Sequence, residues 1–297
     1  MSARLDWKRH GRNWPNRAHS RFLTAGGIAW HIQEMGQGPK LLLLHGTAAS
    51  THSFRALAPL LAPHFTLLIP DLPGHGFTET PSGGRLSLPV MRDLLMALLD
   101  ETGFAPDMAA GHSAGAAILI RTALDEPRFR PRHIVSLNGA LLPFDGVTGR
   151  VAPGLAQILF LNPIAPRVFA FFAGEDSVKR LIGNMGSRID REGVRLYRTL
   201  MSNPVHVAAA LGMMARWDLD GLARDLPRLP VPLTLVTASG DRAVPPGTAS
   251  AVQALLPSAE IRNLRGVGHL AHEERPAVVA DVLEDVARRD GLLPAAG

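Results

Sequence analysis

The chain has 297 residues, of which 46% are hydrophobic and 19% are charged, a balance typical of a folded protein rather than a disordered one. It contains no cysteine, which excludes disulfide bridges, thiolate metal sites and a cysteine nucleophile and favours a cytoplasmic location. The net charge is +5, but the arginines are scattered without a basic run or interleaved aromatic residues, so we expect no nucleic-acid partner.

Neither export nor a transmembrane segment is expected from the sequence. The first twenty residues lack the apolar stretch of a secretory signal. The most apolar stretch, residues 155–173, is interrupted by Pro163, Pro166 and Arg167, which makes it a poor transmembrane candidate. Peripheral contact with a membrane surface stays open.

Apolar runs of strand length alternate along the chain with amphipathic runs of helix length, a pattern typical of parallel strands joined by crossover helices. After a hairpin around 28–35, we expect strands at 40–44, 65–69, 107–110, 134–137, 233–237 and 260–264. The expected helices are 53–62, 88–101, 114–125, 248–256 and a last one from 276. The predicted fold class is therefore α/β, with a mostly parallel central sheet flanked by helices.

The alternation stops after Asn138 and resumes at Leu233. We interpret residues 141–217 as a helical cap inserted after the sixth strand, and residues 1–140 and 218–297 as the core. The cap carries many aromatic and methionine side chains, which would suit a large flat or acyl-like ligand, although most of them should pack the cap on the core. They are Phe144, Phe160, Phe169, Phe171, Phe172, Met185, Met201, Met213 and Met214.

The pentapeptide GHSAG, residues 111–115, lies between a predicted strand and a predicted helix. At such a turn a serine can be exposed above the sheet, and flanking glycines let the turn close. Because short motifs of this kind also occur by chance, Ser113 needs a base and an acid elsewhere in the chain to count as a nucleophile.

Asp241 is the candidate for the acid and His269 the candidate for the base, so that the three residues follow in the order Ser, Asp, His along the chain. Asp241 follows the strand 233–237, at the carboxyl end where ligand sites of parallel sheets gather, and His269 follows the next strand on a glycine-rich loop. Asn138, at the end of another strand, cannot carry the charge that stabilises an imidazolium. We therefore predict the catalytic triad Ser113, Asp241 and His269.

Backbone amides close to the expected nucleophile could bind a developing oxyanion. Thr47 follows the strand 40–44 and Ala114 follows Ser113, the two positions where this arrangement places the donors. His45 is expected to be structural, and the loop 71–76 to shape the wall of the site. The pair His269 and His272, with Glu273 beside it, has no third convincing metal ligand. Neither a metal nor a cofactor is therefore predicted.

These motifs resemble the α/β-hydrolase superfamily from Leu41 to about Val286. Four stretches are similar to a narrower group, the magnesium-chelatase accessory α/β-hydrolases of bacteriochlorophyll biosynthesis. They are residues 6–7 with 14–17, 43–53 (LLHGTAASTHS), 136–144 (SLNGALLPF) and 268–276 (GHLAHEERP). The resemblance implies a helper in magnesium insertion into protoporphyrin, with a porphyrin or a chelatase subunit as partner; it doesn't identify a substrate.

Three functions stay open at this point. The first is esterase-like hydrolysis of a small apolar substrate through an acyl-enzyme on Ser113. The second is another reaction of the same triad, such as a general carboxylesterase, haloperoxidase or carbon–carbon bond hydrolase activity. The third is a non-catalytic accessory protein that holds a porphyrin or a chelatase subunit under the cap. Dehalogenases and epoxide hydrolases use an aspartate where Ser113 stands.

Overall fold

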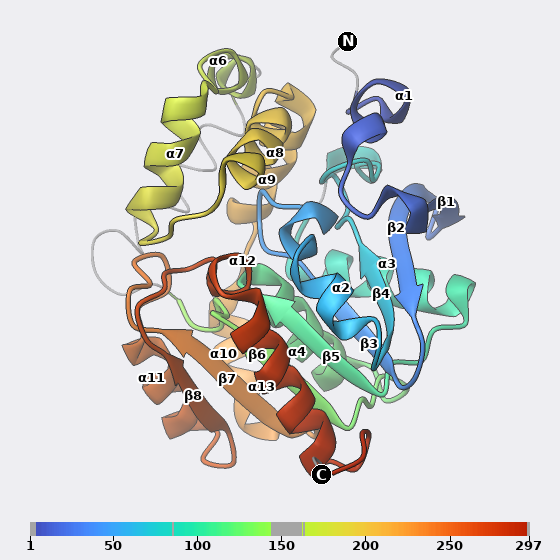
Figure 1. The fold of residues 1–297 in the computed structure, drawn as a ribbon, viewed down its shortest axis with the longest axis vertical. Coiled ribbons are helices and arrows are strands. Elements are labelled where there is room, and N and C mark those ends of the chain that lie inside the picture. The colour runs from blue at the N-terminus through green and yellow to red at the C-terminus, as the bar shows by residue number, and fades with distance from the viewer. Residues whose placement is uncertain (1–3, 85, 144–161, 163, 296–297) are drawn as a thin grey trace.

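The computed structural model describes residues 4–84, 86–143, 162 and 164–295. In this part of the chain, eight strands form one sheet in the order β1-β2-β4-β3-β5-β6-β7-β8 (Figure 1). The first two strands pair antiparallel with each other, β2 pairs antiparallel with β4, and all other neighbours are parallel. The strands are β1 (Ser20–Ala25), β2 (Ile28–Gly36), β3 (Lys40–Leu44), β4 (Thr66–Pro70), β5 (Met108–His112), β6 (His133–Leu137), β7 (Leu233–Ala238) and β8 (Glu260–Leu264).

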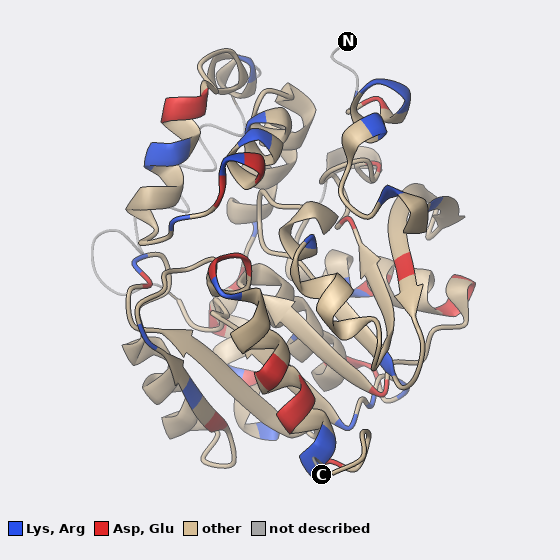
Figure 2. Ribbon diagram, in the orientation of Figure 1, with Lys and Arg blue, Asp and Glu red and all other residues tan. Residues whose placement is uncertain are grey.

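Helices cover both faces of the sheet, which explains why its central strands are apolar throughout. Along β3, Leu42 and Leu44 pack on the side of α3, α4, α10 and α11, whereas Leu41 and Leu43 pack on the side of α2 and α13. Charged residues lie mainly on the helices and loops (Figure 2). These helices are α2 (Leu57–Leu61), α3 (Leu88–Thr102), α4 (Ala114–Asp125), α10 (Leu219–Asp225), α11 (Gly247–Leu255) and α13 (Pro276–Arg289).

Further helices lie at one end of the molecule, above the sheet (Figure 1). They are α1 (Trp7–His10), α6 (Ala165–Phe171), α7 (Glu175–Asn184), α8 (Arg191–Met201) and α9 (Pro204–Met214). The last four follow β6, and we propose that residues 141–217 form a cap on a core of residues 1–140 and 218–297. Phe144 and Phe160, named above as candidates for the cap lining, lie outside the described residues. No described helix is long and apolar enough to cross a membrane.

One predicted helix differs from the observed structure. In place of one continuous helix over residues 53–62, the chain forms a 3-10 turn at Thr51–Phe54 and the short helix α2. Pro59 explains the difference, because its missing N–H could not bond to the carbonyl of Arg55 if the helix began at Ser53. A short helix that the sequence did not predict, α12 (Ala271–Glu274), precedes α13.

Candidate active site

Ser113 occupies a sharp turn between the carboxyl end of β5 and the start of α4. Its φ is +51°, a value that non-glycine residues adopt only when the surrounding structure imposes it. The turn is possible because its neighbours are glycines: a Cβ at Gly111 would lie 2.5 Å from the Ala116 nitrogen, and one at Gly115 would lie 2.4 Å from the Leu44 carbonyl oxygen. The site thus holds its serine in a strained, tightly packed turn.

Asp241 and His269 are hydrogen-bonded to each other. His269 Nδ1 donates to Asp241 Oδ2 over 2.9 Å, and the carboxylate side chain is fully buried. The other carboxylate oxygen, Oδ1, accepts the backbone amides of Ala243 and Val244, each at 2.8 Å. With its proton on Nδ1, the imidazole presents a bare Nε2, the form required of a general base.

His112 connects the serine turn to the histidine loop. Its Nε2 donates to the backbone carbonyl of His269 over 2.9 Å, and the centroids of the two rings are 4.7 Å apart. Burial lowers the pKa of His112 well below its usual range, so it stays neutral. Within the described residues, Ser113 Oγ makes no hydrogen bond; in ligand-free enzymes the nucleophile–base contact is often long.

Asn138 contacts Asp241, the candidate acid, a contact that sequence reasoning missed. It is 3% exposed, and its Nδ2 donates to Asp241 Oδ2 over 2.8 Å. From the sequence alone, Asn138 is only excluded as the acid itself, because an amide carries no charge. Its position offered a signal, because β6 and β7 are neighbours and the residues after their carboxyl ends must therefore lie close together.

The segment between α7 and α8 holds both loops of the site. The carbonyl of Met185 accepts the amide of Arg242 at 3.2 Å and that of His269 at 3.3 Å. Ser187 Oγ accepts the amide of Leu270 at 2.8 Å. One backbone carbonyl from the proposed cap therefore joins the loop of Asp241 to the loop of His269.

A buried charged network also ties α8 to α12, two residues after His269. The Glu273 carboxylate accepts Ser53 Oγ at 2.9 Å and Tyr197 Oη at 2.8 Å, and it pairs with Arg55. Burial raises the pKa of Glu273 in spite of these partners. Arg55 also contacts Asp190, at the start of α8, over 2.8 Å.

The two backbone amides predicted to bind an oxyanion lie beside the turn of Ser113. Ala114 is the first residue of α4, where backbone amides have no partner within the helix. Thr47 follows β3, the parallel neighbour of β5, and its hydroxyl donates to the sulfur of Met213 in α9 over 3.6 Å. Within the described residues, neither amide donates a hydrogen bond.

The residues given structural roles have structural partners. His45 Nδ1 donates to the carbonyl of Gly46 at 2.8 Å, and its Nε2 accepts the amide of Leu72 at 2.9 Å. Asp71 is fully buried, pairs with His31 at 2.8 Å and accepts the amide of Thr51 at 2.7 Å. In the described part of the chain, no group of three or more His, Asp or Glu side chains is arranged to hold a metal ion.

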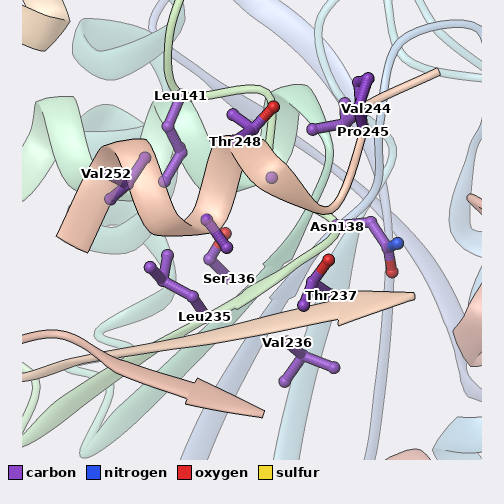
Figure 3. Close-up of a pocket in the computed structure, with 12 residues that line it drawn as sticks. Ser136, Asn138, Leu141, Leu235, Val236, Thr237, Val244, Pro245, Thr248 and Val252 are labelled. Carbon is purple, nitrogen blue, oxygen red and sulfur yellow. The ribbon is translucent and has the colours of Figure 1, made fainter. Parts of the chain in front are cut away.

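A cavity of about 20 Å³ lies between the ends of β6 and β7 and the helix α11 (Figure 3). Ser136 and Asn138 line it together with mostly apolar side chains such as Leu141, Leu235 and Val252. It is large enough for one water molecule and far smaller than a substrate pocket. It therefore belongs to the packing around Asn138, the residue that donates to Asp241.

The mostly parallel sheet, the strained serine turn after β5 and the hydrogen-bonded Asp–His pair on the loops after β7 and β8 define the class of α/β-hydrolase-fold proteins. The chain matches the family described as "Alpha/beta hydrolase family" over residues 41–282 and belongs to that family. This confirms the fold predicted from the sequence.

Several known proteins are similar to the chain. The "Magnesium-chelatase 30 kDa subunit" of Rhodobacter capsulatus is 40% identical over 88% of this chain and 92% of its own length. A "Pimeloyl-[acyl-carrier protein] methyl ester esterase" of Xanthomonas campestris pv. campestris (strain 8004) is 30% identical over 83% of this chain and 95% of its length. A crystal structure of a putative lipase from Acinetobacter baumannii AYE has a TM-score of 0.78 and 20% identity, covering 98% of both chains.

Proposed function

We propose that the protein is a serine hydrolase that cleaves a carboxylic ester, or a similar acyl bond, of a small apolar substrate. The observation that carries the proposal is the buried Asp241–His269 hydrogen bond beside the strained turn of Ser113. Similarity to a methyl ester esterase over most of both chains supports ester hydrolysis over the other reactions of this fold.

In the proposed mechanism, His269 Nε2 takes the proton of Ser113 Oγ while that oxygen attacks the carbonyl carbon. The amides of Thr47 and Ala114 stabilise the oxyanion, and Asp241 stabilises the imidazolium. Collapse of the intermediate expels the alcohol, which leaves with the proton from His269. Water, deprotonated by His269, then attacks the acyl group, and the acid departs as Ser113 regains its proton.

A fluorophosphonate probe tests this proposal. We expect covalent labelling of the wild-type protein and none of Ser113→Ala, because only an activated serine attacks such a probe at a useful rate. Ser258→Ala is the matched control, since Ser258 is exposed on the loop before β8 and should not affect labelling. Equal labelling of wild type and Ser113→Ala would remove the triad assignment.

We also propose that the protein assists magnesium insertion into protoporphyrin, in the cytoplasm, with a chelatase subunit or a porphyrin as partner. The support is the 40% identity to a magnesium-chelatase subunit over most of both chains. The identity leaves two contributions possible, hydrolysis of a small compound by the triad and holding of a macrocycle or a partner without chemistry.

A deletion strain separates these contributions. We expect magnesium chelation to fall and protoporphyrin to accumulate when the protein is removed, measured by pigment extraction and fluorescence. If hydrolysis is the contribution, Ser113→Ala will not restore chelation; full rescue by Ser113→Ala would assign a holding role. Unchanged porphyrin levels in the deletion strain would contradict the pathway assignment and leave the hydrolase proposal standing.

A further inference from the structure

Helix α6 exposes its large apolar side chains and buries its small ones. Phe171 is 84% exposed and Phe172, directly after the helix, is 70% exposed, whereas Ala165 and Ala170 are buried. A helix on a water-facing surface normally has the opposite arrangement. Other large apolar side chains of this region are also exposed, and we call the set the apolar tip: Ile164, Val168, Phe169, Phe171, Phe172 and Leu181.

Exposed apolar side chains that are grouped in this way mark an interaction site. Figure 1 places α6 at the end of the molecule farthest from the carboxyl terminus, with α1, α7 and α8 at the same end. The tip therefore lies where it can meet a surface before the rest of the protein does.

The positive charge of the chain is concentrated at the same end. The four helices α1, α6, α7 and α8 carry eight Lys and Arg residues and three Asp and Glu residues. Their excess of five positive charges equals the net charge of +5 of the whole chain. Figure 2 shows basic residues on all four helices around the apolar tip. An anionic surface would therefore be attracted to this end and not to the others.

A groove of about 420 Å³ lies between α1 and α8 within this basic region. The groove is lined by four residues that can carry a positive charge, Arg9, His10, Arg195 and Arg198. It is also lined by two residues with hydroxyl side chains, Thr199 in α8 and Ser202 directly after it. Guanidinium groups match the geometry of phosphate oxygens and can bind them through two hydrogen bonds. The groove is large enough for a phosphate-bearing headgroup.

We propose that this end of the protein docks on an anionic lipid surface, with the apolar tip inserted among the acyl chains and the groove holding lipid phosphates. A bilayer supplies an apolar layer bordered by phosphates without any need for a matching shape, and aromatic residues flanked by Lys and Arg are typical of proteins that lie in this interface. A protein partner would instead need a complementary apolar surface. The docking site doesn't involve the triad and is independent of the proposed hydrolysis.

Vesicle co-sedimentation of the full chain tests the proposal. We expect binding to vesicles of about one part phosphatidylglycerol to three parts phosphatidylcholine, much weaker binding to phosphatidylcholine alone, and a decrease with added salt. Phe171→Ser with Phe172→Ser should weaken binding at least about tenfold by removing inserted apolar surface. Arg195→Gln with Arg198→Gln should weaken it by roughly thirtyfold, because each basic residue near an anionic surface contributes about fivefold.

Matched double variants on other elements provide the controls. Leu60→Ser with Leu255→Ser removes exposed apolar side chains of α2 and α11, and Arg262→Gln with Arg265→Gln removes exposed charges at β8. Both should bind vesicles like the wild type. Hydrolysis of a water-soluble ester, measured in parallel, should be unchanged in the tip and groove variants.

Three results would overturn the proposal. One is no binding to the phosphatidylglycerol vesicles. Another is binding that the tip and groove variants leave unchanged. The last is self-association without lipid that Phe171→Ser with Phe172→Ser abolishes, which would assign the apolar tip to a second copy of the chain.

Discussion

Replacing Asp241 by Asn should leave the fold intact and lower kcat on a small ester by about four orders of magnitude. The amide would keep the shape of the side chain, but it would lose the charge that stabilises the imidazolium and favour the wrong tautomer of His269. Asn138 makes the substitution more damaging, because its Nδ2 faces the Asp241 oxygen that accepts from His269 and would then face another amide. Steady-state hydrolysis of a nitrophenyl ester measures the effect, and circular dichroism checks the fold.

Asp281→Asn is the control for this experiment. Asp281 is an exposed carboxylate of α13, so removing its charge should leave kcat unchanged. A loss of less than tenfold in Asp241→Asn would show that another group serves as the acid.

The protein should lose several kcal/mol of stability between about pH 7 and about pH 5, since each fully buried neutral histidine costs roughly 2 kcal/mol over this range. Burial lowers the pKa of seven buried histidines, to about 4 for His206 and about 3 for His272. The others are His45, His52, His75, His112 and His133. In the unfolded chain these groups would titrate near the ordinary value of about 6.5.

The direction in which stability changes with pH follows from the number of protons that the folded and unfolded chains bind. Because the folded-state pKa values are depressed, the unfolded chain binds more protons below about pH 6.5, and stability falls as the pH drops toward the folded values. Each of His52, His75, His112 and His272 has one ring nitrogen without a partner among the described residues, so a proton added there would find no acceptor.

Urea denaturation at the two pH values measures this loss. His272→Gln should reduce the loss by roughly one histidine's share, about 2 kcal/mol, because it removes one titrating group. His19→Gln, at an exposed position directly before β1, should leave the loss unchanged. An unfolding free energy that is the same at both pH values would contradict the argument.

Much of the fold could be predicted because strand and helix periodicity are local. The strand 260–264 was predicted at its observed bounds, and the candidates Asp241 and His269 followed from the rule that sites gather at carboxyl strand ends. The support for these residues depends on contacts between distant parts of the chain. The hydrogen bonds to the Met185 carbonyl and the Arg55–Glu273 ion pair are such long-range contacts, and neither leaves a pattern in the sequence.

Charge illustrates the same limit. Along the sequence the arginines are scattered, and a search for a basic run finds nothing. Folding brings α1 beside α8 and so places Arg9 and Arg198, which are far apart in the chain, on one groove. The exposed face of α6 also depends on packing, because the sequence shows an apolar stretch without showing which of its side chains the core covers.

The contacts of the segment at Met185 have a consequence for exchanging the proposed cap between related proteins. Gly186 has a φ of +82°, and a Cβ there would lie 1.9 Å from the carbonyl oxygen of Gly240. A transplanted segment that does not reproduce this close approach would displace the loops of Asp241 and His269 together. Specificity and turnover would then change at once, so a chimaera should retain residues 185–190 from the host and exchange only the helices on either side.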